Sequence, residues 1–209
     1  MKIYQSLTLL AISALFISSC STSTKLTATW QATPGESYQF KNIAIIGIAN
    51  KPEMRKSVED AFETMLDSQG FNTTGALMFL PPNASKETIS KEIVIEFLNA
   101  GKFDAVITIG LVRKEENSTY VPGQYYYVPN YNVPFYDYYG QMSSYYYSPG
   151  YYEESVSYLL QTNLYSFPDG KILWSAQTTT TPLKELSQTS TALATTLGQE
   201  LINSKIIVP

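Results

Sequence analysis

The chain has 209 residues, one cysteine, no histidine and a formal net charge of −4 at pH 7. The lack of histidine excludes Ser-His-Asp and Cys-His catalysis and His-ligated metals, and the single cysteine excludes zinc and iron–sulfur sites. Because nucleic acids are bound mainly through Lys and Arg at the phosphates, the acidic balance argues against a nucleic-acid partner. We therefore expect neither a cofactor nor a metal.

The first nineteen residues have the pattern of a secretory signal peptide. Lys2 gives a short positive start, and residues 7–17 form an apolar run broken only by Thr8 and Ser13. That run is shorter than the ~20 apolar residues that a membrane-spanning helix needs, so we interpret it as the hydrophobic region of a cleaved signal. Two small residues follow, and then comes Cys20, the only cysteine.

The stretch Ile17-Ser18-Ser19-Cys20 resembles the bacterial lipobox, in which an aliphatic residue and two small residues precede an invariant cysteine. The resemblance implies that the Cys20 thiol carries diacylglycerol, that the signal is cut before it, and that the new amino terminus receives a further acyl chain such as palmitate. Each buried methylene contributes ~0.8 kcal/mol, so two or three chains hold a protein durably on a membrane. Ser21, in place of an aspartate, implies the outer membrane, with the domain facing the periplasm. The alternative is that Cys20 is an ordinary buried thiol.

Removal of residues 1–19 leaves 190 residues (209 minus 19), enough for one domain whose core needs no disulfide. Residues 20–29 are small, polar and without periodicity, which predicts a flexible lipidated tether. We place a single α/β domain at residues 30–209.

The first half of this domain alternates predicted strands and helices. Residues 40–49 and 103–112 contain continuous apolar, β-branched runs, which are typical of strands covered on both faces, and residues 71–80 form another extended segment. Residues 52–69 and 85–101 carry apolar side chains at three- and four-residue spacing, which predicts amphipathic helices. This strand-helix-strand-helix-strand order predicts a parallel sheet with helices packed on it.

Two groups of charged residues accompany these elements. Residues 113–116 (Arg-Lys-Glu-Glu) predict that the strand over 103–112 ends in solvent. The helix over 52–69 has a charged face, which we interpret as solvated rather than as a site. This face consists of Glu53, Lys56, Glu59, Asp60, Glu63 and Asp67.

The segment 120–152 interrupts the pattern. It holds thirteen of the seventeen tyrosines, with Asp137 as its only charged residue. Neither a strand period nor a helix period is sustained, so we expect a long Tyr-rich loop. Loops of this length are usually either functional or disordered.

The last part of the chain predicts an antiparallel hairpin and a helix. Residues 153–167 and 171–181 form two strands joined by Pro168-Asp169-Gly170. Residues 186–203 form an amphipathic helix with Leu186, Leu193, Leu197 and Leu201 on its apolar stripe, and residues 206–208 add a short strand or dock on the core. The predicted fold class is α/β, a mixed sheet of about five strands with helices packed on it.

These residues together resemble a known group of proteins. The lipobox, the strand Ile43–Ile48, the strand beginning Phe103-Asp104-Ala105 and the hairpin over 162–175 are similar in order to the α/β periplasmic lipoproteins related to the curli secretion lipoprotein, the penicillin-binding-protein activator lipoproteins and the amino-terminal domain of TolB. The resemblance implies a non-enzymatic role: binding a partner protein, building a secretion assembly or regulating wall synthesis. The Tyr-rich insert departs from that pattern, and no pore-forming transmembrane hairpin is evident.

The Tyr-rich loop has two interpretations. It is a low-complexity surface loop, or it is a recognition surface, because tyrosine offers a large contact area at low entropic cost and its ring stacks on sugars. On the second interpretation the partner is an envelope protein or a glycan. The candidate binding residues are Tyr125, Tyr126, Tyr127, Tyr145, Tyr146 and Tyr147.

Two further function classes remain open at this stage. The first is a structural envelope lipoprotein without a specific partner. The second is a glycan hydrolase with a carboxylate pair drawn from Asp137, Glu153 and Glu154. Glu153 and Glu154 are adjacent and would point to opposite faces of a strand, so a pair would need Asp137 with one of them.

Overall fold

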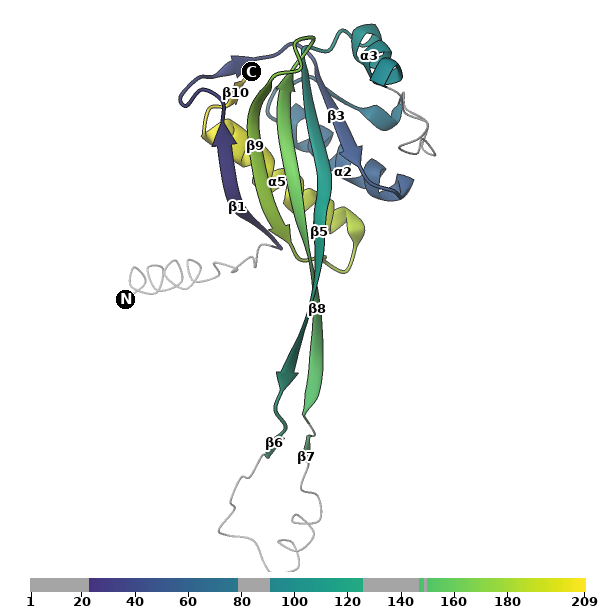
Figure 1. Ribbon diagram of the computed structural model, residues 1–209, viewed down its shortest axis with the longest axis vertical. Coiled ribbons are helices and arrows are strands. Elements are labelled where there is room, and N and C mark those ends of the chain that lie inside the picture. The colour runs from purple at the N-terminus through teal and green to yellow at the C-terminus, as the bar shows by residue number, and fades with distance from the viewer. Residues whose placement is uncertain (1–22, 79–90, 126–146, 149) are drawn as a thin grey trace, which may run out of the picture.

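The computed structural model describes residues 23–78, 91–125, 147–148 and 150–209. Its centre is a six-stranded mixed sheet in the order β1-β9-β8-β5-β3-β4 (Figure 1). These strands are β1 (Thr24–Gln31), β3 (Ile43–Ile48), β4 (Thr73–Gly75), β5 (Ala105–Val121), β8 (Tyr151–Ser166) and β9 (Ile172–Thr180). The helices are α2 (Pro52–Asp67), the 3-10 helix η1 (Ala76–Met78), α3 (Lys91–Ala100) and α5 (Leu186–Asn203). Two short pairs complete the fold: β2 (Tyr38–Gln39) with β10 (Ile207–Val208), and β6 (Gln124–Tyr125) with β7 (Tyr147–Ser148).

The strand directions confirm the predicted α/β class and mixed sheet. β3 runs parallel to β4 and β5, whereas the β5–β8, β8–β9 and β9–β1 pairs are antiparallel. The extended segment expected over 71–80 is shorter than predicted, because β4 ends at Gly75 and η1 follows it.

The sixth strand comes from the segment that the composition predicts to be a tether. β1 pairs with β9 from Thr24 to Gln31, so residues 24–29 of the expected tether over 20–29 belong to the sheet. Threonine is a good strand former, and Thr24 is buried with its hydroxyl oxygen 3.1 Å from that of Thr180. A threonine-rich edge strand and a flexible linker therefore have similar compositions.

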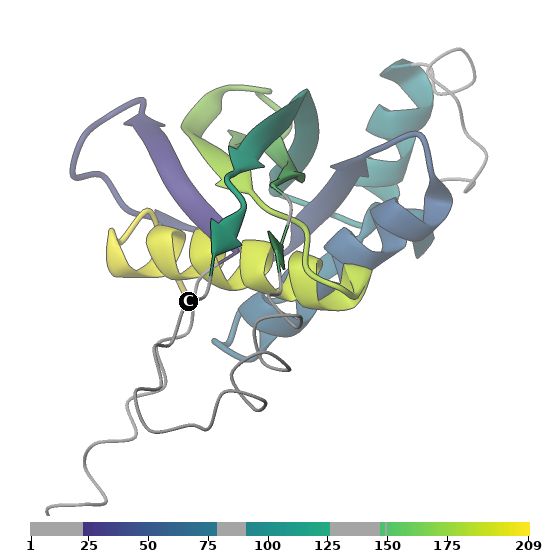
Figure 2. The same ribbon diagram turned by 90° about the horizontal axis from the view of Figure 1, so that it is seen from below.

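The core lies mainly between one face of the sheet and helices α2 and α5 (Figure 2). The stripe predicted for α5 is largely confirmed, since Leu193, Leu197 and Leu201 are buried while Leu186 is exposed. On the opposite face α3 covers only the side of the sheet near β3, where its residues pack on Ala44. Among the residues that the structure describes, no helix combines the length and apolarity needed to cross a bilayer.

Candidate functional site: the tyrosine ribbon and an acidic pocket

β5 and β8 continue together beyond the rest of the sheet as a two-stranded antiparallel ribbon (Figure 1). β3 pairs with β5 only as far as Gly110, and β9 pairs with β8 only as far as Tyr158. Residues 113–121 of β5 and 151–159 of β8 are paired with each other, and we call them the ribbon; at its base Tyr158 and Leu159 are still paired with β9 as well. The remainder of the six-stranded sheet with its helices is called the body.

The structure corrects two boundaries that the sequence predicts. The strand expected to end at residues 113–116 runs on to Val121, and the loop expected over 120–152 is narrower, because β8 begins at Tyr151. An exposed ribbon buries neither face, so the apolar alternation that identifies a strand is missing. Its charges alternate instead: Arg113 is ion-paired with Glu115, and Lys114 with Glu116, on opposite faces.

Residues 113–119 and 153–159 form the shaft of the ribbon, and their charged side chains keep it solvated. The hydrogen bond between Lys114 and Glu116 raises the pKa of the lysine and lowers the pKa of the glutamate, so both are ionised at neutral pH. Glu153 and Glu154 follow on β8 opposite Thr119 and Ser118. Both faces of the shaft are thus polar.

The far end of the described ribbon carries exposed tyrosines. Tyr120 lies directly opposite Tyr152, with ring centroids 5.2 Å apart, and Tyr151 lies opposite Val121 on the other face. The exposed fractions are 55% for Tyr120, 57% for Tyr151 and 70% for Tyr152. Gly150 leaves room for the Tyr120 hydroxyl, since a Cβ at Gly150 would lie 2.2 Å from that oxygen.

The structure places two of the six predicted binding tyrosines. Tyr125 and Tyr147 are opposite each other in the β6–β7 pair, which continues the direction of the ribbon (Figure 1). The other four, Tyr126, Tyr127, Tyr145 and Tyr146, lie outside the described residues, and so does Cys20.

Tyr120, Tyr151 and Tyr152 at the end of the ribbon are not among the binding residues that the sequence predicts. A signal for them exists in the sequence. Pro122-Gly123 and Pro149-Gly150 flank the Tyr-rich segment, with β-forming residues just outside each of them. That symmetry is what two paired strands entering a common turn region would produce.

Of the three carboxylates predicted as candidates for glycan hydrolysis, the structure describes two, Glu153 and Glu154. Glu153 and Glu154 lie on opposite faces of β8, as their adjacency predicts. Asp137 lies outside the described residues. Among the described residues no group of Asp, Glu or Cys is arranged to hold a metal ion.

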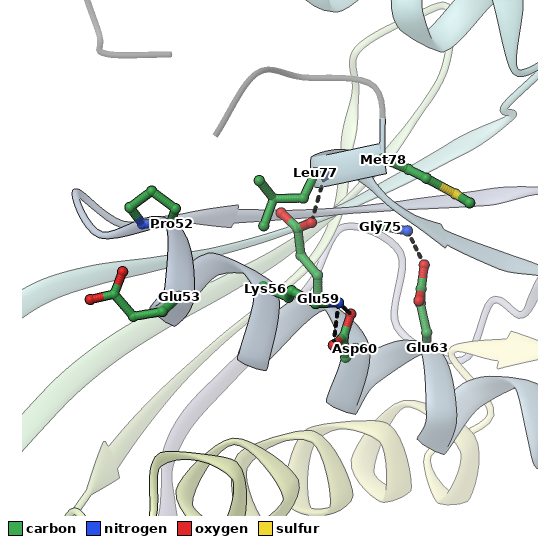
Figure 3. Close-up of a pocket in the computed structure, with 9 residues that line it drawn as sticks. All are labelled: Pro52, Glu53, Lys56, Glu59, Asp60, Glu63, Gly75, Leu77 and Met78. Carbon is green, nitrogen blue, oxygen red and sulfur yellow. Dashed lines mark hydrogen bonds and ion pairs between the residues drawn. The ribbon is translucent and has the colours of Figure 1, made fainter. Parts of the chain in front are cut away.

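A shallow pocket of about 540 Å³ lies beside α2, where that helix faces β4 and η1 (Figure 3). Three α2 carboxylates near it, one helical turn apart, accept hydrogen bonds from alternate backbone N–H groups of the edge segment. Glu59 accepts from Leu77 at 2.7 Å, Glu63 accepts from Gly75, and Asp67 accepts from Thr73 at 3.1 Å. β4 is the edge strand of the sheet, so these bonds satisfy N–H groups that would otherwise invite strand addition. These carboxylates therefore act as structural acceptors.

Glu59 differs from the solvated residue that the sequence predicts. It is 1% exposed, and its second oxygen accepts the N–H of Gly47 on β3 at 2.9 Å. Arg55, one turn earlier, is also buried. Burial raises the pKa of Glu59, and the two backbone hydrogen bonds and the Arg55 charge offset that rise only in part.

The raised pKa predicts how Glu59 affects stability. The folded protein holds a proton on Glu59 more tightly than the unfolded chain does, so this contribution is complete below pH about 4.5 and is lost as the pH rises through the raised pKa. We expect the free energy of unfolding of the wild type, minus that of a Glu59→Gln variant, to fall with rising pH in this window. Urea titrations at a series of pH values measure it, with Glu53→Gln, an exposed residue of the same helix, as the charge-removal control. If the difference in unfolding free energy between the wild type and Glu59→Gln rose with pH, the raised pKa of Glu59 would be contradicted.

Comparisons with known proteins give structural matches alone. No protein-family profile matches the chain, and no curated protein matches it by sequence. Among solved structures, it is similar to the PelC dodecamer from Paraburkholderia phytofirmans (14% identity, 83% of this chain and 94% of that chain, TM-score 0.41). It is also similar to lipoprotein GNA1162 from Neisseria meningitidis (12% identity, 78% and 98%, TM-score 0.41). A third match is a putative neuraminyllactose-binding hemagglutinin homolog from Helicobacter pylori (13% identity, 84% and 89%, TM-score 0.37).

Proposed function

We propose that this protein is a lipid-anchored lipoprotein of the bacterial cell envelope that acts as a non-enzymatic binding or adaptor module. Acyl chains on Cys20 hold it on the outer membrane, with the domain facing the periplasm. The Tyr-rich segment 120–152 is its recognition surface for an envelope protein or a glycan.

The observation that carries this proposal is the tyrosine-bearing ribbon. A two-stranded ribbon without a covering layer is at best marginally stable in water, and this one leaves its end tyrosines exposed. Exposed aromatic side chains at the end of a projection gain little for folding. They are well suited to binding, because each ring offers a large area with few rotatable bonds and a hydroxyl that can hydrogen-bond.

Capture from envelope extract tests the proposal. We expect the wild-type protein to retain a defined partner in stoichiometric amount, and a variant with the six candidate tyrosines replaced by serine to lose it. The physical reason is that the serine variant keeps hydroxyl groups but removes the rings. Circular dichroism and the urea midpoint check that the body stays folded.

A matched control changes the same segment without touching a tyrosine. Ser143→Ala with Ser144→Ala should leave capture unchanged. Retained capture by the six-serine variant would count against the Tyr-rich segment as the recognition surface. The absence of any stoichiometric partner of the wild type would favour a structural envelope lipoprotein instead.

A further inference from the structure

The chain enters the body at the same end from which the ribbon leaves it. Thr24 pairs with Thr180, Thr180 pairs with Tyr158, and Tyr158 pairs with Lys114, so these four residues lie side by side across β1, β9, β8 and β5. Lys114 is the second residue of the ribbon. Figure 1 shows the start of β1 and the ribbon at this one end of the body.

The distance from Cys20 to this end is short. Thr24 is four residues after Cys20, and four residues span at most ~14 Å when fully extended. β1 has 8 residues and runs away from the ribbon, so the opposite end of the body is ~26 Å from Thr24. A membrane that holds acyl chains on Cys20 therefore cannot lie against that opposite end. The body therefore faces the membrane with the end that carries the ribbon or with the adjoining β1 edge of the sheet.

The ribbon is longer than this tether. From Lys114 to Val121 it extends ~23 Å beyond the level of Thr24, which exceeds the ~14 Å reach of residues 20–24. A ribbon that pointed straight at the bilayer therefore could not fit between the body and the membrane surface. Because the β6–β7 pair continues beyond the ribbon in the same direction, a ribbon perpendicular to the bilayer would carry that pair into it, so the ribbon must lean along the membrane surface.

The chemistry of the ribbon fits such a contact at its end and not along its shaft. The ion-paired Glu115 and Glu116 and the further carboxylates Glu153 and Glu154 put charges on both faces of the shaft, which makes it unsuited to hydrocarbon. Beyond them Tyr120, Tyr151 and Tyr152 form an exposed aromatic end, and tyrosine is enriched where lipid meets water.

We propose that the aromatic end of the ribbon, formed by Tyr120, Tyr151 and Tyr152, rests in the lipid–water interface of the membrane that carries the acyl chains of Cys20. This inference rests on the proposed lipidation of Cys20. It makes the ribbon a second contact with the bilayer, and it leaves partner recognition to the six candidate tyrosines between Tyr125 and Tyr147.

Spin labels on the full-length lipidated protein test this contact. Because Cys20 is the only cysteine and is acylated, one added cysteine gives one labelled site. Tyr152→Cys carries the test label, Ser155→Cys labels the shaft, and the exposed Lys171→Cys labels the opposite end of the body. The protein is reconstituted into vesicles of phosphatidylcholine and phosphatidylethanolamine, and accessibility to oxygen and to a water-soluble nickel complex is measured.

We expect the label at position 152 to lose accessibility to the nickel complex and gain accessibility to oxygen when vesicles are present. Labels at positions 155 and 171 should keep their accessibility to nickel. A label at position 152 that is as accessible to nickel as the label at 171, on vesicle-bound protein, would overturn the inference. A protein that does not bind the vesicles at all would instead count against the lipid anchor. A Tyr120→Cys label repeats the test if the Tyr152 variant does not fold.

Discussion

Replacing Cys20 with serine is expected to move the protein from the membrane fraction to the soluble fraction of the envelope, or to leave it with an uncut leader. The acylated thiol is the proposed anchor, and its chains contribute ~0.8 kcal/mol for each buried methylene, so their loss removes nearly all membrane affinity. The contact proposed for the aromatic end of the ribbon involves three tyrosines and is small beside two or three acyl chains. Fractionation of cells followed by detection of the protein measures the change.

The neighbouring serine provides the control for this experiment. Ser21→Ala changes one residue beside the anchor without removing the thiol, and it should leave the protein in the membrane fraction. If Cys20→Ser leaves the protein fully in the membrane fraction, and the leader has been removed, the anchor has been assigned to the wrong residue.

Replacing Glu59 with alanine is expected to cost about 2–4 kcal/mol of unfolding free energy, because a buried N–H left without an acceptor costs about 1–3 kcal/mol and Glu59 accepts from two N–H groups. The substitution leaves the N–H of buried Gly47 and of half-buried Leu77 without their acceptor. It also leaves the buried Arg55 without a carboxylate that offsets its charge, and the Arg55 Nε already lacks a hydrogen-bond partner among the described residues. Urea unfolding at pH 7 measures the loss.

Asp60 is the matched control for Glu59. It lies one residue further along α2 and is exposed, and among the described residues its carboxylate pairs with the exposed Lys56, an interaction of about 0–1 kcal/mol. Asp60→Ala should therefore change the unfolding free energy little. Equal losses for the two alanine variants would show that Glu59 does not join α2 to β3 and η1.

The sequence predicts the body of the fold well because its strands and helices follow simple hydrophobic patterns. The run Ile43–Ile48, except for Ile48 at its exposed end, and most of the stripe of α5 bury apolar side chains, and burial is what those patterns report. The short return strand β10 is also one of the two outcomes expected for residues 206–208.

Hydrophobic patterns do not predict those parts of the structure that are held by hydrogen bonds instead of by apolar burial. Thr24–Gln31 forms a strand by pairing with β9, although its composition is that of a linker. The burial of Glu59 depends on two N–H groups, one 12 and one 18 residues away, which no local period reveals. The ribbon has charges on both faces, so it lacks the alternation of a half-buried strand.

For the candidate site, the sequence identifies the Tyr-rich segment but does not predict the two-stranded ribbon that carries it. The density of tyrosines over 120–152 marks the segment as unusual, and two of the six candidates, Tyr125 and Tyr147, are placed opposite each other by β6 and β7. That β5 and β8 extend as a ribbon to carry this segment could not be deduced from composition.

The most direct test of the account is cross-linking in living cells with a photoreactive amino acid placed in the Tyr-rich segment. We predict that positions 126 and 146 each give an adduct of defined mass with the same partner. Position 179, on β9 of the body, should give none. No adduct from either tyrosine position, or the same adducts from position 179, would contradict a recognition role for the Tyr-rich segment.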